Sequence, residues 1–547
     1  MVSDINGTIN GKTITISFPE GVEIKNLIAS FGFTGKSVTV NGVNQQSSVT
    51  ANNFEGPLTY KVLGEDNVSV DYLVKIERTT SAGLSLSDFK VLKANNPSLP
   101  QDYSFTVKQD TLFYTIPPIG VKSLVPVFTT DGKEVFVNGV LQQSGVTGVD
   151  FTQPVKYTVV SQGGFKKNYI VKVNWTFKIP HIYINTTGGV PITSKDVYVT
   201  ATIRIEGNGV YADYDNTTRI RGRGNSTWGM PKKPYRLKLD NNAALFGLQP
   251  EKDWVLLANY LDGTLMLNSV AMKTGRLIGL NYTNNTIPVD LTINNEYKGS
   301  YVFTEQVEVS STRVNIGSTG TLLELDTNYD EEYKFWSANY SLPVMIKEPS
   351  LTDQSQVAAF KTEFEQLENL VAAASFPNNN YKDYIDAESL VNYLIVYQLT
   401  DNEEINHPKS TYMHKVVGGK YFMGPIWDFD WAYGYEGGQI YFGSSYTRPL
   451  FWSTTPPVGK GTRFFSRFML DPAIKTLYKQ KWTAFKTSKL PVLQTYIDEY
   501  ASLIEASQKA DYGIWKRGSG DFKGDVAKLK LWLTNRVGYI DNYVSGF

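Results

Sequence analysis

Residues 424–434 read GPIWDFDWAYG and place two carboxylates, Asp428 and Asp430, inside a run that is otherwise aromatic, aliphatic or glycine. The flanking aromatic residues predict burial, and burying two uncompensated carboxylates is costly, so we expect a cation or a basic partner beside them. Alternate positions of a strand point to opposite faces, so a joint site for a hard cation such as Mg²⁺ needs a turn or bulge between the two. The simpler alternative is that one aspartate caps a turn or pairs with an arginine while the other is solvated.

The composition limits the functions that the chain can have. Lysine plus arginine equals aspartate plus glutamate at 53 each, so no global field attracts nucleic acid or an anionic membrane. The sequence has no cysteine and three histidines, which excludes disulfides and thiolate metal sites and disfavours histidine cages. It has no apolar stretch near about 20 residues, so we expect no transmembrane segment. The aromatic fraction of 13% is typical of β-rich, extracytoplasmic proteins.

The front of the chain contains a repeat, because residues 37–76 align without a gap onto residues 134–173. Both copies contain Val-Asn-Gly-Val and, one residue later, Gln-Gln-Ser. Short segments with alternating β-branched and aromatic residues, separated by Asn-Gly and Gly-Gly turns, are typical of a small β-sandwich. We expect two all-β immunoglobulin-like modules, residues 1–85 and 86–178. A spacer or docking role is the simpler interpretation for them, and contact with a surface glycan or a protein is the alternative.

From about residue 179 the pattern changes, and we expect one large domain over residues 179–547. Residues 181–240 and 287–348 show strand patterns, whereas later segments such as residues 388–399 carry apolar positions at helical spacing. A β-rich part followed by a helix-rich part is an α+β architecture.

The first functional signal in this domain is a basic stretch, residues 219–239, which reads RIRGRGNSTWGMPKKPYRLKL. If it forms strands, Arg219, Arg221 and Arg223 lie on one face, and the glycines let a ligand approach the backbone closely. Cations two residues apart suit phosphate oxygens. The stretch is not a Walker loop, because no Gly-Lys-Ser/Thr follows the glycines. Taken alone, a solvated basic strand face is the simpler interpretation.

The second signal is an acidic stretch, residues 400–413, which reads TDNEEINHPKSTYM and follows the apolar helix pattern. An acid cluster just past a helix and shortly before the aspartate pair is a place where a phosphotransferase can carry a catalytic carboxylate, and Asp401 and Glu404 are the candidates. A solvated loop at the helix end is the alternative. His407 is interpreted as a loop histidine before a proline.

These stretches, in this order and with residues 253–262, 299–306 and 346–349 between them, resemble the CotH family of spore-coat-protein-H-like kinases from about residue 180 to the C-terminus. The resemblance implies an atypical protein-kinase-like fold that binds ATP with Mg²⁺ and phosphorylates a serine or threonine hydroxyl of a protein substrate. The front modules are similar to surface modules that accompany such domains in gut Bacteroidetes. This implies an extracytoplasmic protein, secreted or anchored at the cell surface.

The resemblance also implies roles for single residues. Asp428 would hold Mg²⁺ and Asp430 would assist, whereas Arg221, Arg223 and Lys232 would face the phosphates of the nucleotide. Two further charged positions expected near the nucleotide are Glu305 and Lys347.

The sequence departs from the family pattern at two places. Where the family commonly has an aspartate followed a few residues on by an asparagine, this chain has Glu403 and Glu404 and, after an apparent one-residue insertion, Ser410. Leu267 replaces an expected arginine. Glutamate can accept a proton, but its extra methylene moves the carboxylate by about an ångström, and such a shift lowers the rate when geometry is tight. We expect Glu404 or Asp401 to orient the acceptor hydroxyl.

Two other classes of function stay open on the sequence. A catalytically degenerate CotH-like domain would be a scaffold in a cell-surface binding or adhesion protein, and it would bind no nucleotide. A glycan-processing enzyme would use Asp428 and a second acid as a carboxylate pair about 5 to 10 Å apart beside an aromatic-lined cleft. Such an enzyme would bind sugar and would be indifferent to Mg²⁺.

Overall fold

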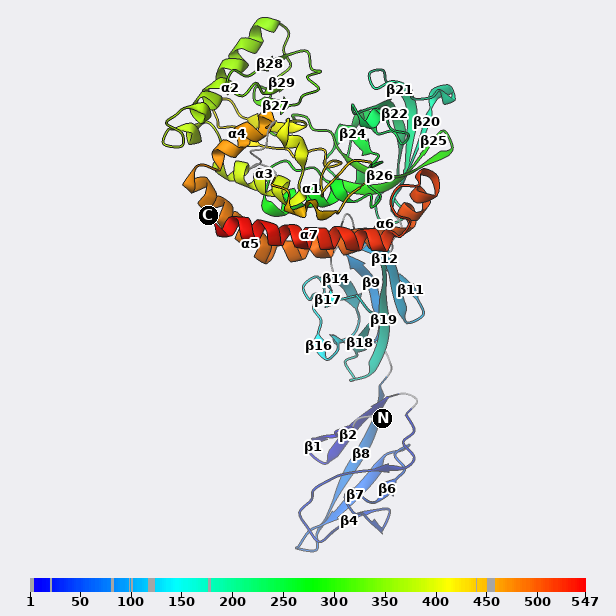
Figure 1. The fold of residues 1–547 in the computed structure, drawn as a ribbon. Helices are drawn as coiled ribbons and strands as arrows, with labels where there is room; N and C mark the ends of the chain where they lie inside the picture. The colour runs from blue at the N-terminus through cyan, green and yellow to red at the C-terminus, as the bar shows by residue number, and fades with distance from the viewer. Residues whose placement is uncertain are drawn as a thin grey trace. The chain divides into compact units, whose positions relative to one another are not determined.

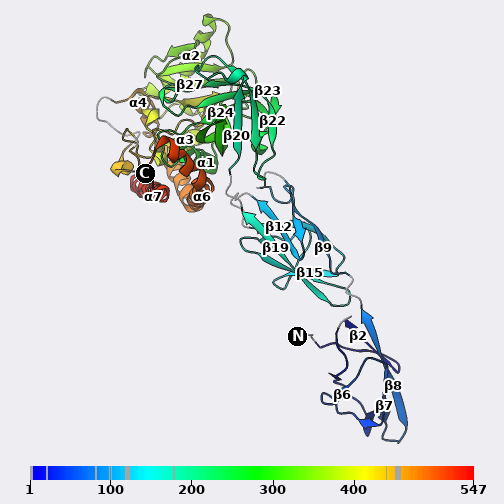
Figure 2. The same ribbon diagram turned by 90° about the vertical axis from the view of Figure 1, so that its right-hand side faces the viewer.

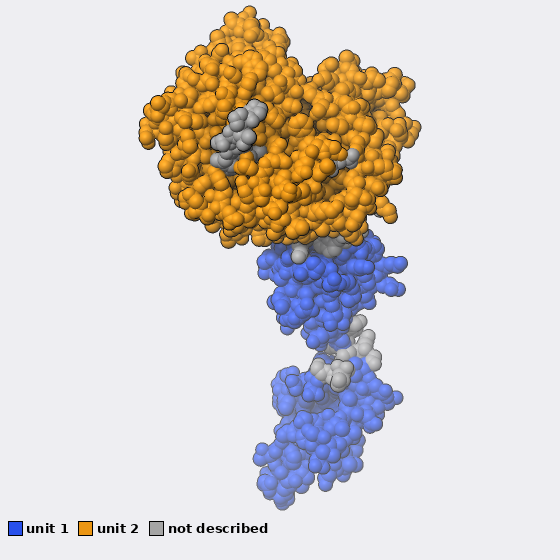
Figure 3. All heavy atoms as spheres, viewed as in Figure 1, with its two compact units in different colours: residues 1–116, 121–174 blue, residues 117–120, 175–547 orange. Residues whose placement is uncertain are grey.

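The computed structural model describes residues 4–19, 22–79, 83–97, 99, 102–116, 123–175, 179–438, 440–449 and 458–547. The chain divides into two compact units, one of residues 1–116 and 121–174 and the other of residues 175–547 together with 117–120 (Figure 3). Strands make up the first unit, whereas the second contains a barrel, a further sheet and the helices (Figure 1).

The first unit contains the same six-stranded sheet twice. The strand order is β1-β2-β8-β7-β4-β5 in the first copy and β11-β12-β19-β18-β15-β16 in the second. Figure 2 labels β2, β7 and β8 of the first copy and β12, β15 and β19 of the second. Corresponding strands β4 and β15 begin 97 residues apart, at Ser37 and Glu134. The repeat predicted from the sequence is therefore present in the fold. The bounds are β1 Thr8–Asn10, β2 Thr13–Pro19, β4 Ser37–Val40, β5 Val43–Asn44, β7 Leu58–Leu63, β8 Ser69–Thr79, β11 Thr106–Lys108, β12 Thr111–Ile116, β15 Glu134–Val137, β16 Val140–Leu141, β18 Val155–Val160 and β19 Lys166–Trp175.

Smaller sheets complete each copy. β3 pairs with β6 in the first copy, and the sheets β10-β9-β14 and β13-β17 belong to the second. Along β18 alternate residues are buried, and the ring of Tyr157 lies 5.3 Å from that of Phe89. Alternation of this kind gives each strand one apolar face, which is the reason these segments form sheets. The bounds are β3 Leu27–Ile28, β6 Ala51–Asn52, β9 Leu86–Val91, β10 Tyr103–Ser104, β13 Ser123–Leu124, β14 Pro126–Thr130 and β17 Val149–Asp150.

The second unit begins with a closed barrel of strands in the order β20-β21-β22-β23-β24-β26-β25. β20 pairs in parallel with β25 and closes it. Inward side chains such as Ile220, Leu237 and Trp254 are fully buried and form the barrel core. The bounds are β20 His181–Thr186, β21 Val199–Glu206, β22 Tyr214–Gly222, β23 Tyr235–Ala243, β24 Glu251–Leu257, β25 Thr286–Ile293 and β26 Glu296–Glu305.

A second sheet, in the order β28-β29-β27-β30-β31, and the helices follow. The long helices α5, α6 and α7 run side by side (Figure 1). The strands are β27 Thr321–Leu325, β28 Lys334–Trp336, β29 Pro343–Glu348, β30 Thr411–Lys415 and β31 Phe422–Met423. The helices are α1 Leu267–Ile278, α2 Val357–Ala372, α3 Ala387–Thr400, α4 Lys460–Phe468, α5 Pro472–Ser488, α6 Leu490–Trp515 and α7 Phe522–Ser545. Short 3₁₀ turns are η1 Thr187–Gly189, η2 Thr227–Gly229, η3 Leu245–Gly247, η4 Gln354–Gln356, η5 Tyr381–Asp383, η6 Glu403–Asn406 and η7 Ser444–Thr447.

Helix α3 ends in the interior of the second unit, where the acidic stretch begins. Asp386 caps its start by accepting a hydrogen bond from the backbone N–H of Ser389, and Asp401 ends it in a left-handed conformation with φ 53°. Most of its residues are buried because α1, α5 and α7 all contact it.

The predicted order of a β-rich part and a helix-rich part is confirmed. None of the helices in the described residues combines the length and hydropathy of a membrane-spanning segment.

Candidate functional site

A cavity of about 370 Å³ lies in the second unit, lined by residues of the barrel strands β22 and β23, of the second sheet and of the loop after α3. Pockets for small-molecule ligands span roughly 300–1,000 Å³, so the size suits such a ligand. Of the residues predicted to form a site, seven line this cavity: Arg221, Arg223, Lys232, Lys347, Glu404, Asp428 and Asp430.

The turn expected between the two aspartates is present. Asp428 has a left-handed backbone with φ 61°, and residues 424–429 form no regular strand. The strand alternation that would send Asp428 and Asp430 to opposite faces is broken, and both side chains line the cavity. The neighbouring ring of Phe429 is fully buried, whereas Asp428 and Asp430 are themselves half-buried.

Two asparagines hold this turn in place. Asn268 Nδ2, in the first turn of α1, donates to Asp430 Oδ1 at 2.8 Å. Asn402 Nδ2 donates to the carbonyl oxygen of Asp428 at 2.9 Å, and Asn402 Oδ1 accepts from the N–H of Glu404 at 2.9 Å. The loop after α3, the start of α1 and the aspartate turn are therefore tied together through buried amides.

The carboxyl groups of this cluster are poorly solvated. Burial raises the pKa of Asp428, and the nearby Arg223 opposes that rise. Burial and the charge of Asp428 raise the pKa of Asp430 to about 8. Burial, and then Asp428, also raise the pKa of Glu404 well above its usual value, and Glu404 Oε2 is buried without a hydrogen-bond partner. A cation placed here would favour the ionised form of all three groups.

Mg²⁺ fits this set of oxygen donors only together with a ligand. In the described ranges no three His, Asp or Glu side chains are grouped so that they could hold a metal ion by themselves. Mg²⁺ is usually bound by one or two carboxylates plus water and substrate phosphates. Asp428 and Asp430 supply such a pair, and the unpartnered Glu404 Oε2 lies in the same cavity.

The barrel side of the cavity presents two arginines that form no ion pair with a carboxylate of the described residues. The guanidinium of Arg221 lies 5.1 Å from the ring centre of Tyr198, and its Nε is buried without a hydrogen-bond partner. The guanidinium of Arg223 lies 5.0 Å from the ring centre of Trp427. Burial lowers the pKa of Arg223, whereas Asp428 raises it. Both arginines therefore have donors available for an anionic ligand.

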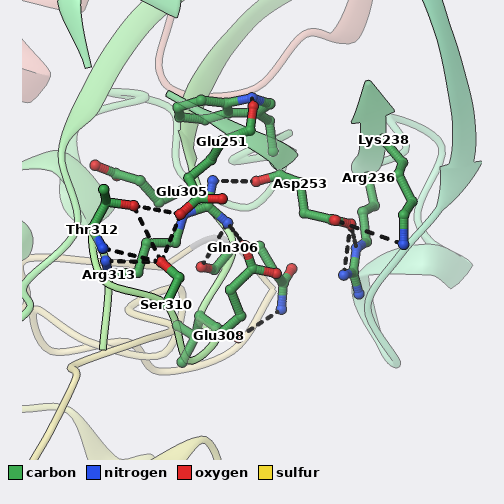
Figure 4. Close-up of polar contacts among 12 residues, drawn as sticks. Arg236, Lys238, Glu251, Asp253, Glu305, Gln306, Glu308, Ser310, Thr312 and Arg313 are labelled. Atoms are coloured by element: carbon green, nitrogen blue, oxygen red, sulfur yellow. Dashed lines mark hydrogen bonds and ion pairs between the residues drawn. The ribbon is translucent and has the colours of Figure 1, made fainter. Parts of the chain in front are cut away.

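The basic side chains of the neighbouring strand β23 are already paired with a carboxylate. Arg236 donates to Asp253 Oδ1 from Nε and Nη2, at 3.0 and 2.8 Å, and Lys238 Nζ lies 3.8 Å from Asp253 Oδ2 (Figure 4). Arg313 donates to the carbonyl oxygen of Asp253 and pairs with Glu308 (Figure 4). These contacts brace β23 against β24 and so support the hairpin that carries Arg221.

Lys232 and Lys347 line the cavity, but their ammonium groups are already paired. Lys232 is 1% exposed and its Nζ lies 2.5 Å from Asp511 Oδ2 on α6. Lys347 pairs with Glu324 at 3.2 Å and with Glu331. Burial lowers the pKa of Lys347, but these two glutamates outweigh it and the pKa is raised.

Glu305 and Asp401 lie outside the cavity lining. Glu305, at the end of β26, accepts hydrogen bonds from the N–H and the side-chain amide of Asn285 at 2.7 and 2.8 Å. Asp401 is fully buried between Arg536 at 3.2 Å and Arg448 at 3.3 Å. Burial raises the pKa of Asp401 to about 7, and the two arginines oppose that rise. Its contacts connect the end of α3 to α7.

One glycine of the basic stretch has a role other than the expected one. A Cβ on Gly222 would lie 2.2 Å from the ring of Trp228, so this glycine makes room for a side chain of the protein. The site also includes Asn268, Asn402 and Lys409, to which no sequence pattern assigns a role. Asn402 and Lys409 belong to the acidic stretch, but Asn268 is separated from Asp430 by 162 residues, and no local pattern marks such a contact.

Residues 220–540 match the family model described as CotH kinase protein, and they cover more than half of the chain. The chain belongs to the CotH kinase family. The seven predicted residues that line the cavity all lie within the part that matches the CotH model.

The first unit matches a second family model. Residues 2–76 and 98–173 match the model described as SGBP, N-terminal, a domain of Bacteroidetes surface glycan-binding proteins. A putative glycoside hydrolase from Bacteroides thetaiotaomicron is 16% identical, with 47% of this chain and 82% of that chain covered and a TM-score of 0.12. The extracellular cadherin domains 1–4 of protocadherin gamma B7 are 12% identical, covering 43% and 73% at a TM-score of 0.10. At such TM-scores neither likeness bears on the fold. A comparison with curated proteins gave no match.

Proposed function

We propose that this CotH-family chain transfers the γ-phosphoryl group of ATP to a serine or threonine hydroxyl of a protein substrate, with Mg²⁺ as the bound cation. One observation carries the proposal. Two arginines that form no ion pair with the described carboxylates, Arg221 and Arg223, line a cavity together with the buried Glu404 and the half-buried Asp428 and Asp430. A ligand that is both anionic and metal-binding, such as a nucleoside triphosphate, can bind the arginines through its phosphates and the carboxyl groups through its metal ion.

Each of these side chains has a place in the reaction. Asp428 and Asp430 would hold Mg²⁺, which when bound neutralises charge on the phosphate oxygens. Arg221 and Arg223 bind those oxygens through their free N–H groups. The P–O bond to the ADP bridging oxygen breaks, and a bond forms from phosphorus to the acceptor oxygen. Glu404 accepts the proton of the acceptor hydroxyl, because its Oε2 has no other partner.

The fold assignment is part of this proposal. We take the barrel and the helix-rich part as the two lobes of an atypical protein-kinase-like domain, because the cavity lies where residues of both meet. We take the two copies of the repeated sheet as immunoglobulin-like sandwiches, because each copy adds smaller sheets to the six-stranded one.

A second function is supported by the match of the first unit to the SGBP N-terminal model. In that function the chain is a cell-surface protein that contacts a glycan or a protein through its first unit, and the CotH domain is a folded scaffold. The departures from the family pattern at Glu403 and Leu267 favour this alternative. Both functions place the protein outside the cytoplasm, at the cell surface or secreted.

Nucleotide binding separates the two functions. The test measures the thermal midpoint with ATP and Mg²⁺, with ATP and EDTA, and with neither, on the native chain and on Asp428→Ala. Ligand at about 100 times its dissociation constant adds about 2.7 kcal/mol to the free energy of unfolding, which is a shift of a few degrees. Asp498→Ala, at an exposed aspartate on α6 whose side chain is 59% exposed, is the matched control.

The kinase proposal requires a Mg²⁺-dependent shift that Asp428→Ala loses and Asp498→Ala keeps. No shift at millimolar ATP contradicts it and favours the scaffold function.

A further inference from the structure

The four lysines that line the cavity differ in what their ammonium groups contact. Lys232 and Lys347 are paired with carboxylates, as described above, and Lys195 Nζ donates to Asn225 Oδ1 at 2.8 Å. Lys409 differs from these three, because no hydrogen bond or ion pair to the described residues engages its ammonium group. Its positive charge is available to a ligand.

An aromatic ring supports Lys409 instead of a carboxylate. Lys409 Nζ lies 5.1 Å from the ring centre of Trp431, and Arg221 and Arg223 have the same kind of support from other rings. A ring face attracts a cation but does not neutralise its charge. The cavity therefore has three cations that form no ion pair with the described residues, and each lies near an aromatic ring.

Lys409 comes from the helix-rich side of the cavity, whereas the two arginines come from the barrel. Its backbone N–H donates to the carbonyl oxygen of Glu404 at 2.8 Å, so the two residues share one compact loop. The charge of Lys409 also lowers the pKa of Glu404 and that of Asp428, although burial of each carboxyl has the larger effect and raises it. Lys409 is thus close to the carboxylate that, in the proposed function, accepts the proton of the acceptor.

We propose that Lys409 is a catalytic residue that binds the terminal phosphoryl group of the nucleotide, the group that is transferred. The inference rests on the proposed function. The phosphate nearest to Glu404 is the one nearest to the acceptor, because Glu404 contacts the acceptor hydroxyl. During transfer the electron pair of the breaking P–O bond goes to ADP and the hydroxyl proton goes to Glu404. The ammonium group of Lys409 takes no part in the proton transfer and stabilises charge on the terminal phosphate oxygens.

The test compares ATP with ADP, since only ATP carries the terminal phosphate. Isothermal titration calorimetry in the presence of Mg²⁺ gives both dissociation constants for the native chain, Lys409→Met and Lys409→Arg. The matched control is Lys460→Met, because Lys460 Nζ lies 4.1 Å from the ring centre of Trp336 and Lys460 is not part of the cavity lining. Circular dichroism and the thermal midpoint without ligand show whether each variant is folded.

We expect Lys409→Met to weaken ATP binding about tenfold or more, because it removes a charge-assisted contact, and to change ADP binding less than about threefold. Lys409→Arg retains most of the preference for ATP, and Lys460→Met behaves as the native chain. Equal losses for ATP and ADP in both Lys409 variants, or unchanged affinities, overturn the inference. If the native chain binds neither nucleotide, the proposed function itself fails, and that result is distinguishable because it does not depend on any variant.

Discussion

Asn268 Nδ2 donates to Asp430 Oδ1 at 2.8 Å, although the two residues are 162 positions apart in the sequence. The same side chain accepts a hydrogen bond from the backbone N–H of Phe429 at 2.9 Å. Asn268 is 3% exposed, so no water can replace these contacts without opening the core. A single amide at the start of α1 thus sets the direction of one of the two proposed metal ligands.

Replacing Asn268 with alanine should weaken Mg²⁺ binding. The substitution leaves the buried N–H of Phe429 and the half-buried carboxylate of Asp430 without this partner, which costs about 1–3 kcal/mol and lets Asp430 leave its position. We expect a smaller Mg²⁺-dependent thermal shift with ATP and a higher Mg²⁺ concentration at half-saturation. Asn284→Ala is the control, because Asn284 is also buried but donates to the carbonyl oxygen of Glu305 and does not line the cavity. A Mg²⁺ dependence that is the same in both variants would show that Asn268 has no role in positioning.

Glu404→Gln should separate binding from transfer. Glutamine keeps the shape of the side chain but cannot accept the hydroxyl proton, so we expect phosphate incorporation to fall about 100-fold or more. The affinity for ATP with Mg²⁺ should stay within about threefold of the native value, since Glu404 does not bind the phosphates in the proposed function. Glu403→Gln is the control, because Glu403 pairs with Arg448 and lies outside the cavity lining. Transfer at the native rate by Glu404→Gln would exclude Glu404 as the base.

Lys232→Met should act on stability. It leaves Asp511 buried without its partner, and breaking a buried ion pair costs about 3–5 kcal/mol. Burial already raises the pKa of Asp511, and Lys232 opposes that rise. The cost should therefore be larger at pH 8 than at pH 5, where Asp511 can take up a proton. Urea denaturation of Lys232→Met measures this, and Lys530→Met, which breaks an exposed pair with Asp498, should cost less than about 1 kcal/mol. A stable Lys232→Met chain that has lost ATP binding would instead assign Lys232 to the nucleotide.

Asp401 should make stability fall as the pH rises from about 4 to about 7. Its pKa is raised by burial to about 7 in the folded chain, against about 3.9 in an unfolded one. In this window the folded state binds more protons than the unfolded state, so the contribution of Asp401 to the free energy of unfolding falls by at most about 1.4 kcal/mol per pH unit. The measurement is urea denaturation of the native chain and of Asp401→Asn across this range. The difference between them should fall with pH and become flat above pH 7. A difference that grows with pH would show that the pairs with Arg536 and Arg448 dominate over burial.

Local patterns in the sequence were sufficient for the coarse fold. The repeat, the β-rich part and the helix-rich part all follow from short-range periodicity and from an alignment of the chain with itself. Arg221, Asp428 and Glu404 could also be found, because charged residues inside apolar or glycine-rich segments stand out locally. Asn268 could not be found in this way, because an asparagine after an apolar run has many ordinary explanations.

The sequence by itself determined which chemical groups are present and in which order. That order was enough to indicate the CotH family and a site that combines acidic and basic side chains. Only the tertiary structure decided which of the charges are free. Lys232 forms an ion pair with Asp511, 279 residues away, whereas Lys409 and Arg223 lie over aromatic rings and form no ion pair with the described residues. The physical reason is that an ion pair depends on the distance between two side chains in the folded chain, and burial makes that distance decisive.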